Sequence, residues 1–403
     1  MTRSQKLAFC LMATIPLGTA LAQTSTDQTS ENTAATSSPV AYVYVSRPTH
    51  IDGFAASSSG ALTPVPGSPL ANTSAGRMSV TKKFLFGLAD DSFLVSTFSI
   101  NSKGSLKQVS SLNISKYETG VSLACVDYAD MQVDFAQSAL YVQENWDCAD
   151  QGYEPYLTFH IESNGDLQFL GHSGGQLDDN IQVNIYLTMA GTDKFAYDGL
   201  CEEDNGNLSV IDIYKRESNG LLTYIGQDNQ TPAGENGKQY CAGILAADSE
   251  NHLAVALQRI DGQGGDDGPL NGPTFLTTYT ENSNGSLSTK STWENMPEAL
   301  VGDDSGVTSM SVSPGNKFLA VSGYAGGFQI FHFNGSDPIT KYSGVLQSGV
   351  QFFQFGWDKA NHLYALGGGK LFVYTVTSSE IKQAPGSPYS IPESSSVSVL
   401  SLQ

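Results

Sequence analysis

The segment SVSPGNKFLAVSG (residues 311–323) contains a short apolar strand, a tight polar turn and a second strand that ends in small residues. Five other segments share this pattern: SVTKKFLFGLA (79–89), DFAQSALYVQE (134–144), TMAGTDKFAYDG (188–199), LAADSENHLAVAL (245–257) and FGWDKANHLYALG (355–367). Each is followed by alternating apolar residues with a Gly turn between them, as in YLTFHIESNGDLQFLG (156–171). This alternation and turn chemistry predict β-hairpins, so each unit supplies four strands.

The glycines of these second turns recur at gaps of 44, 61, 55, 65 and 50 residues: Gly60, Gly104, Gly165, Gly220, Gly285 and Gly335. A seventh turn falls at Ser378-Ser379, and 363 residues (41–403) divided by seven give about 52 per unit. Four-stranded units of about 40–50 residues are typical of propeller blades. We therefore predict an all-β, seven-bladed β-propeller. A β-sandwich is the alternative, but a sandwich gives no reason for seven similar units.

The two ends of this region complement each other. The stretch AYVYVSR (41–47) matches the second strand of the other units and has no first strand before it, while SVSVLSL (396–402) resembles an orphan first strand. Pairing them would complete the first blade and remove an exposed sheet edge. The sequence therefore predicts a ring that is closed by the C-terminal strand.

The N-terminus has the features of a signal peptide. Arg3 and Lys6 precede the apolar run 7–17, which is followed by the small-residue motif Ala20-Leu21-Ala22. The run is shorter than the roughly 20 residues that span a membrane. We expect a signal peptide over 1–22, a disordered Ser/Thr-rich spacer over 23–40 and the propeller over 41–403. The protein is then secreted or periplasmic, without a membrane span.

The net charge of the chain limits the classes of partner that it can bind. The chain has 20 Lys+Arg against 40 Asp+Glu, a formal net charge of −20, while 40% of residues are hydrophobic. That apolar content excludes global disorder, and the negative field repels nucleic acid and anionic membranes. We expect a monomer whose partner is a small molecule or an extracellular protein or glycan.

Four cysteines remain after removal of the signal peptide, in a compartment that permits disulfides. They are Cys125, Cys148, Cys201 and Cys241. Neighbouring loops would pair Cys125 with Cys148 and Cys201 with Cys241; free structural thiols are the alternative. Because the sequence has no C-x-x-C motif and no Cys/His cluster at zinc spacing, it does not favour a structural metal site.

Three motifs carry a family resemblance. FAASSSGALTPVPGSP (54–69), its echo APGSP (384–388) and SPGNKFL (313–319) resemble repeats of the lactonase-type seven-bladed propellers, which are similar to 6-phosphogluconolactonase. The resemblance extends over residues 41–403. It implies the same fold, and enzymes of that family hydrolyse or form lactones with His, Arg and Glu side chains at one mouth of the channel.

The candidate site residues lie in loops that join second to third strands or one blade to the next, and these loops share one face of a propeller. The candidate catalytic residues are Arg77, Arg259 and Glu144, and the candidate ligand contacts are Arg47, Trp146 and Tyr324. Arginine can hold a carboxylate or a polarised carbonyl; the alternative is that these arginines neutralise the surrounding carboxylates. The oxygen-rich loop 261–272 makes calcium possible, with Asp261, Asp266 and Asp267 as ligands.

Two functions follow. The favoured one is a non-catalytic, exported lactonase-like propeller that binds a ligand or protein on its loop-rich face. It is favoured because none of the six histidines falls at the strand head where the family often carries one: His50, His160, His172, His252, His332 and His362. The alternative is a hydrolase of an unphosphorylated lactone, in which Arg77 or Arg259 stabilises the oxyanion. Neither function requires a cofactor.

Overall fold

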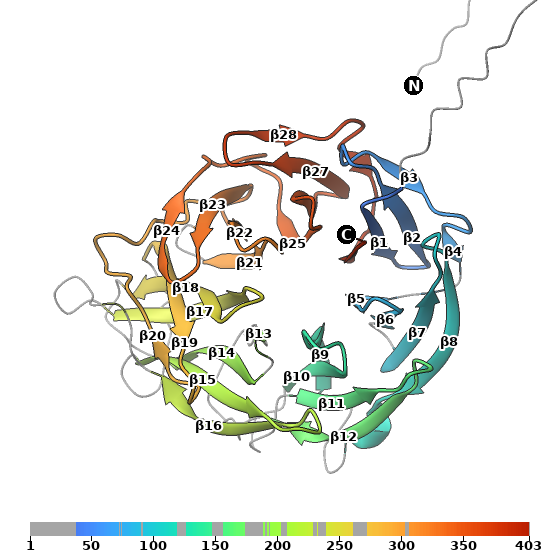
Figure 1. Cartoon of the computed structure of the whole chain (residues 1–403), viewed down its shortest axis with the longest axis horizontal. Helices are drawn as coiled ribbons and strands as arrows, with labels where there is room; N and C mark the ends of the chain where they lie inside the picture. Colours follow the sequence, from blue (N-terminus) through green and yellow to red (C-terminus); the bar gives the residue numbers. More distant parts are fainter. Residues whose placement is uncertain are drawn as a thin grey trace, which may run out of the picture. The chain divides into compact units, whose positions relative to one another are not determined.

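The computed structural model describes residues 38–402 except 72, 74, 90–91, 119–125, 147–155, 174–187, 190–191, 193, 203–207, 229–231, 233–238, 261–271 and 303–305. These residues lie in one compact unit, Ser38–Gln403. They form seven antiparallel sheets arranged as blades around a centre (Figure 1). The predicted seven-bladed, all-β propeller is therefore confirmed.

Blade 1 contains β30 (Ser396–Ser401), β1 (Ala41–Arg47), β2 (His50–Ala56), β3 (Leu62–Pro64) and β4 (Leu70–Ala71). Blade 2 contains β5 (Arg77–Val80), β6 (Phe84–Leu88), β7 (Leu94–Ile100) and β8 (Leu106–Asn113). Blade 3 contains β9 (Val126–Val133), β10 (Ala139–Trp146), β11 (Tyr156–Ile161) and β12 (Leu167–Ser173). The single-turn 3-10 helix η1 (Ser115–Tyr117) lies between blades 2 and 3 in the sequence.

Blade 4 contains β13 (Thr188–Met189), β14 (Phe195–Glu202), β15 (Leu208–Arg216) and β16 (Leu222–Asp228). Blade 5 contains β17 (Gln239–Ala247), β18 (His252–Ile260), β19 (Thr274–Glu281) and β20 (Leu287–Ser288). Blade 6 contains β21 (Val307–Val312), β22 (Phe318–Gly323), β23 (Phe328–Asn334) and β24 (Asp337–Lys341). Blade 7 contains β25 (Phe352–Trp357), β26 (His362–Gly367), β27 (Lys370–Val376), β28 (Ile381–Gln383) and β29 (Tyr389–Ser390).

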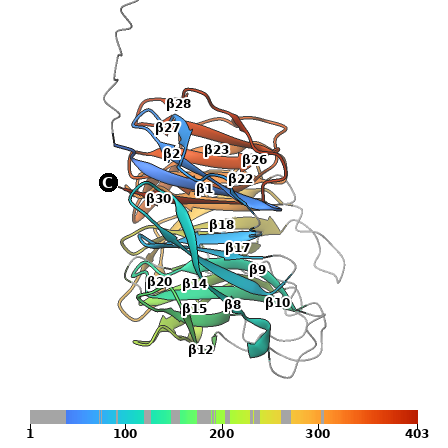
Figure 2. The same ribbon diagram turned by 90° about the vertical axis from the view of Figure 1, so that its right-hand side faces the viewer.

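The last strand completes the first blade, as predicted. β30 pairs antiparallel with β1, from Ala41 opposite Ser401 to Ser46 opposite Ser396, and the two strands lie side by side in the side view (Figure 2). Both are largely buried. The first and last strands of the propeller therefore hold each other in place.

The hydrophobic core lies between neighbouring blades. Phe195 and Tyr197 of blade 4, for example, pack in one cluster with Leu253 and Val255 of blade 5. Clusters of the same kind join blades 1 and 2, 2 and 3, 5 and 6, 6 and 7, and 7 and 1. Among the described residues no helix is long and apolar enough to cross a membrane.

The repeating turn glycines also lie at the contacts between blades. All six have φ between +61° and +99°, a region that side chains with a Cβ rarely adopt. Each of the six lies over a side chain at the start of the preceding blade's second strand: Gly60 over His362, Gly104 over Tyr42, Gly165 over Phe84, Gly220 over Ala139, Gly285 over Phe195 and Gly335 over His252. His252 and His362 are therefore packing residues between blades.

Candidate functional site

The innermost strands of the blades surround a central cavity of about 550 Å³. Its wall takes residues from β5, β9, β13, β17, β21 and β25 together with Ser395, which directly precedes β30. All seven blades thus contribute to this one cavity. The polar side chains that line it are Arg77, Asp130, Gln132, Thr188, Thr308, Ser309, Ser311, Gln354 and Ser395.

One end of the cavity is set by the starts of inner strands. Arg77 is the first residue of β5, Thr308 and Phe353 are the second residues of β21 and β25, and Ser395 comes just before β30. We call this end the strand-start mouth. Connections between blades lead into it, so it lies on the predicted loop-rich face. The opposite end includes Phe135, which follows β9.

In the described part of the chain, four inner strands carry a β-bulge at the cavity. The pairing register skips residue 129 in β9, residues 243–244 in β17, Thr308 in β21 and Phe353 in β25. Asp130, Ile244, Thr308 and Phe353 line the cavity at or beside these bulges. A bulge re-aims a side chain and is common next to binding and catalytic sites. The repeated bulges therefore mark this level of the channel as the candidate site.

Arg77 and Asp130 are the charged side chains of the cavity wall in the described part of the chain. One Oδ of Asp130 accepts the Met131 N–H at 2.7 Å, and the Arg77 Nη1 donates to the Gly76 carbonyl at 3.1 Å. Burial raises the pKa of the Asp130 carboxyl, and the Met131 N–H bond and the positive charge of Arg77 offset only part of that rise. The cavity wall thus holds a cationic donor and a carboxyl whose pKa is raised by burial.

Further donors and acceptors flank this pair. The Gln354 Oε1 accepts the Val397 N–H at 2.6 Å, which fixes the amide and leaves its Nε2 as the donor end. The Ser395 hydroxyl donates to the Ala75 carbonyl at 3.2 Å, so its oxygen can accept. The Thr308 hydroxyl lies 3.2 Å from the Ser322 hydroxyl. The strand-start mouth can therefore donate and accept hydrogen bonds around an oxygen-rich ligand.

The structure brings only one of the three candidate arginines to the described cavity wall. Arg77 lines it, whereas Arg47 at the end of β1 lies 3.6 Å from Asp52, and the His50 ring lies 3.7 Å from the same carboxylate oxygen. Arg259 lies near the end of β18, where its N–H donates to the Pro273 carbonyl.

The other candidates also lie away from the described cavity wall. Glu144 is fully buried in β10, opposite Tyr128 of β9, with the His172 Nδ1 3.8 Å from its carboxylate. Tyr324 follows β22 and is 57% exposed. Trp146 ends β10, and its side chain lies outside the described part.

Burial, a hydrogen bond to Glu118 and the charges of Glu118 and Glu144 all raise the pKa of Tyr128. This buried network joins η1 to blade 3, since His172 Nε2 also lies 3.1 Å from the Tyr117 carbonyl. The sequence offered no pattern that pairs Glu144 with His172, because they lie on β10 and β12, which are not neighbours in the sheet.

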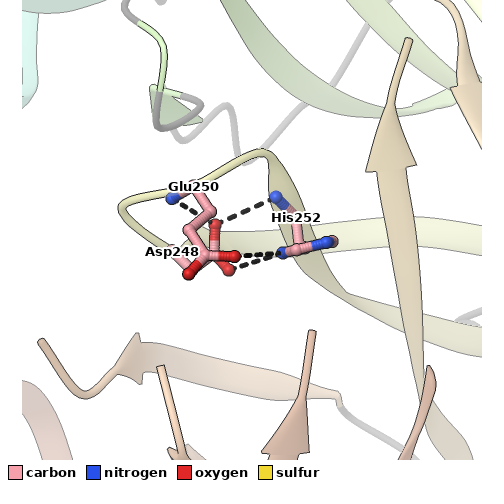
Figure 3. Close-up of side chains that lie close together, drawn as sticks. All are labelled: Asp248, Glu250 and His252. Carbon is pink, nitrogen blue, oxygen red and sulfur yellow. Dashed lines mark hydrogen bonds and ion pairs between the residues drawn. The ribbon is translucent and has the colours of Figure 1, made fainter. Parts of the chain in front are cut away.

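The side chains of Asp248, Glu250 and His252 lie close enough together to be candidate metal ligands (Figure 3). The Asp248 carboxylate accepts the N–H groups of Glu250 and His252 at 2.8 and 3.0 Å and bonds the His252 ring at 2.7 Å. Asp358 and His362 repeat this in blade 7, with a ring contact of 2.8 Å. We call this set of hydrogen bonds from one Asp to the turn and to the His ring a brace. Because the same brace recurs in two blades and uses both Asp oxygens, we interpret it as part of the turn structure.

Several predicted residues lie outside the described part. Asp261, Asp266 and Asp267 do, and so do Cys125 and Cys148. Cys241 is buried in β17 and disulfide-bonded. Its predicted partner is Cys201 in β14, and Gly199, two residues earlier in β14, abuts the backbone of Ala242 and Gly243. The strands are close enough for that pairing, which stays a prediction.

Comparison with known proteins supports the fold. No family model and no curated protein matches the sequence. Among solved structures, a candidate 6-phosphogluconolactonase from Bacteroides uniformis aligns with TM-score 0.62 and 12% identity, over 89% of this chain and 99% of that one. Another from Bacteroides fragilis aligns with TM-score 0.62 and 14% identity, over 91% and 99%.

A third similar structure carries a different description. A hypothetical selenium-binding protein from Sulfolobus tokodaii aligns with TM-score 0.55 and 10% identity, over 90% of this chain and 94% of that one. Proteins described in such different ways share this architecture, so the fold by itself does not decide the ligand. The chain is a lactonase-like β-propeller in its fold, and its cavity is the candidate ligand site.

Proposed function

We propose that this lactonase-like propeller is a binding module that holds a small, neutral, oxygen-rich molecule at the strand-start mouth of its channel. The observation that carries the proposal is that Arg77 and Asp130 both line the cavity wall, where the charge of Arg77 acts on the Asp130 carboxyl. Their formal charges cancel, while Arg77 and Gln354 donate and Asp130 and Ser395 accept hydrogen bonds. Such a wall suits hydroxyl and carbonyl groups.

Charge argues for a neutral ligand over a phosphorylated one. A phosphate group would bring about two negative charges into a wall whose described cation, Arg77, shares the cavity with the Asp130 carboxyl. The chain also carries a formal net charge of −20, which lowers the local concentration of anions. We therefore place unphosphorylated sugars and lactones ahead of the phosphorylated lactone named for similar structures.

Calorimetry tests this proposal directly. We would titrate methyl β-D-glucopyranoside, δ-valerolactone and 6-phosphogluconate into the full chain and into Arg77→Ala, with Arg47→Ala as the matched control. Binding of a neutral probe that weakens about ten-fold in Arg77→Ala, and not in Arg47→Ala, supports the site. Tighter binding of the phosphorylated probe, or no binding of any probe to folded protein, overturns it.

A second function is hydrolysis of an unphosphorylated lactone, and the raised pKa of Asp130 favours it. Asp130 would take a proton from water as that water attacks the lactone carbonyl, and Arg77 would hold the resulting oxyanion. The ring C–O bond then breaks, and the leaving alkoxide receives the proton from Asp130. Acid release in a pH-stat that is lost in both Asp130→Asn and Arg77→Ala would establish an enzyme; no release above the blank leaves the binding module.

Calcium binding by Asp261, Asp266 and Asp267 is a separate proposal, supported by the oxygen-rich, Gly-containing sequence of that loop. Thermal unfolding in calcium and in EGTA tests it. The site is excluded if the wild-type unfolding midpoint is the same in calcium and in EGTA. It is also excluded if calcium shifts the midpoint of Asp266→Asn/Asp267→Asn as much as that of wild type.

Export and disulfide formation rest on the sequence. We propose cleavage after residue 22, release to the periplasm or medium as a monomer, and the pairs Cys125–Cys148 and Cys201–Cys241. N-terminal sequencing of the mature protein and non-reducing peptide mapping test these points. An uncleaved N-terminus or a different pairing contradicts them.

A further inference from the structure

Phe353 is an exposed aromatic side chain placed in the cavity wall by a bulge. The register of β25 skips it, pairing Phe352 with Gly367 and Gln354 with Leu366. Phe353 is 43% exposed, whereas Phe352 and Phe355 on the same strand are 2% and 8% exposed. Phe355 also borders the cavity, but it is largely buried, so Phe353 is the phenyl group of this strand that is turned out of the core.

The surroundings of Phe353 differ from those of its neighbours. Phe352 makes edge contacts with Phe328 and Phe372, at centroid distances of 5.1 and 5.3 Å. No comparable ring contact of Phe353 occurs among the described residues. Exposed apolar area contributes nothing to folding unless it is covered. A phenyl held toward a cavity by a backbone irregularity is therefore available to a ligand.

The residue that follows supplies polarity beside this ring. Gln354 also lines the cavity, and the Val397 N–H holds its Oε1, so its Nε2 is the end that donates to a ligand. Ser395 lies just before β30, on the blade between those of Gln354 and Arg77. A ligand on Phe353 therefore meets a donor, a hydroxyl and then the side chains of Arg77 and Asp130.

We infer that the ligand of this cavity is a ring, stacked by its apolar C–H face on Phe353 and hydrogen-bonded at its rim by Gln354 and Arg77. Six-membered sugar and lactone rings combine such a face with oxygen substituents at the edge. An open-chain polyol has the same oxygens but no fixed flat face. This inference rests on the proposed binding function and adds to it that Phe353 selects for ring shape.

The test compares rings with open chains in one protein. Calorimetry would measure methyl β-D-glucopyranoside against D-glucitol, and δ-valerolactone against 1,5-pentanediol, in wild type, Phe353→Ala and Phe353→Tyr. We expect Phe353→Ala to weaken the rings about ten-fold and the open chains much less, and Phe353→Tyr to retain ring binding. Phe135→Ala is the control, because Phe135 is 44% exposed and lines the cavity at its other end.

The outcomes separate the two proposals. Equal binding of rings and open chains, unchanged in Phe353→Ala but weakened in Arg77→Ala, overturns ring selection and leaves the binding function standing. Binding of no probe to folded wild type overturns both. A loss in Phe135→Ala equal to that in Phe353→Ala overturns the assignment of the ligand to the strand-start mouth.

Discussion

Arg216 at the end of β15 donates a hydrogen bond to the Asp134 carboxylate in the turn between β9 and β10, and so joins blade 4 to blade 3. The Asp134 side chain is fully buried, and that of Arg216 is 14% exposed. Arg216 also bonds the Ser138 and Tyr141 hydroxyls at 2.8 and 3.2 Å. The contact is a buried, charge-assisted clasp between two blades.

Removing only the Arg216 side chain should lower stability strongly, because it leaves the buried charge of Asp134 uncompensated. We expect Arg216→Met to lower the free energy of unfolding in urea by about 3 kcal/mol, and Asp134→Asn/Arg216→Met to recover part of that loss. Lys215→Met is the control, since its pair with Glu217 is exposed and should contribute less than about 1 kcal/mol. A double variant as unstable as Arg216→Met would contradict this.

The turn glycines allow backbone strain and packing to be separated. Gly67 has φ +82° with open space around it, whereas Gly104 has φ +78° and an added Cβ would collide with the Tyr42 ring. We expect Gly67→Ala to lower stability by about 1 kcal/mol through strain alone. Gly104→Ala should lower it by about 2–4 kcal/mol, because strain and overpacking add. Equal losses in urea unfolding would show that the Tyr42 contact contributes nothing.

Because the pKa of Asp130 is raised, we expect its replacement to increase the stability of the folded protein in a pH-dependent way. Because the folded-state pKa lies above the ordinary value of 3.8, ionised Asp130 lowers the stability of the folded protein. Asp130→Asn should therefore be more stable than wild type at pH 7. The advantage should shrink as pH falls through the raised pKa toward 3.8. Urea unfolding from pH 3 to pH 8 measures it, with exposed Asp337→Asn as the control; a loss of stability at pH 7 would contradict the prediction.

The braces of blades 5 and 7 should behave alike toward metals. We expect Asp248→Asn and Asp358→Asn each to lower stability by about 1–3 kcal/mol through the lost bond to the histidine ring. EDTA or added zinc should leave the wild-type melting temperature unchanged. If zinc stabilises wild type and Asp358→Asn but not Asp248→Asn, blade 5 holds a metal and the brace interpretation is wrong.

The sequence predicted the parts of the fold that depend on local chemistry. The six turn glycines and the β1–β30 pairing were visible because turns and strand alternation leave a periodic pattern. The bulges at Thr308 and Phe353 were not visible. One extra residue in a strand exchanges the two faces of the alternation beyond it, but the alternation itself continues. For that reason the sequence selected Arg77 but missed Asp130, Gln354 and Phe353 as its neighbours in the cavity.

Pairing of the first strand with the last has a consequence for synthesis. β1 is made at the beginning of the propeller and β30 at its very end, more than 340 residues later. Until β30 has been made, β1 has no inner neighbour and the first blade cannot be finished. A product that stops short of Ser396 therefore keeps an open sheet edge available to other chains.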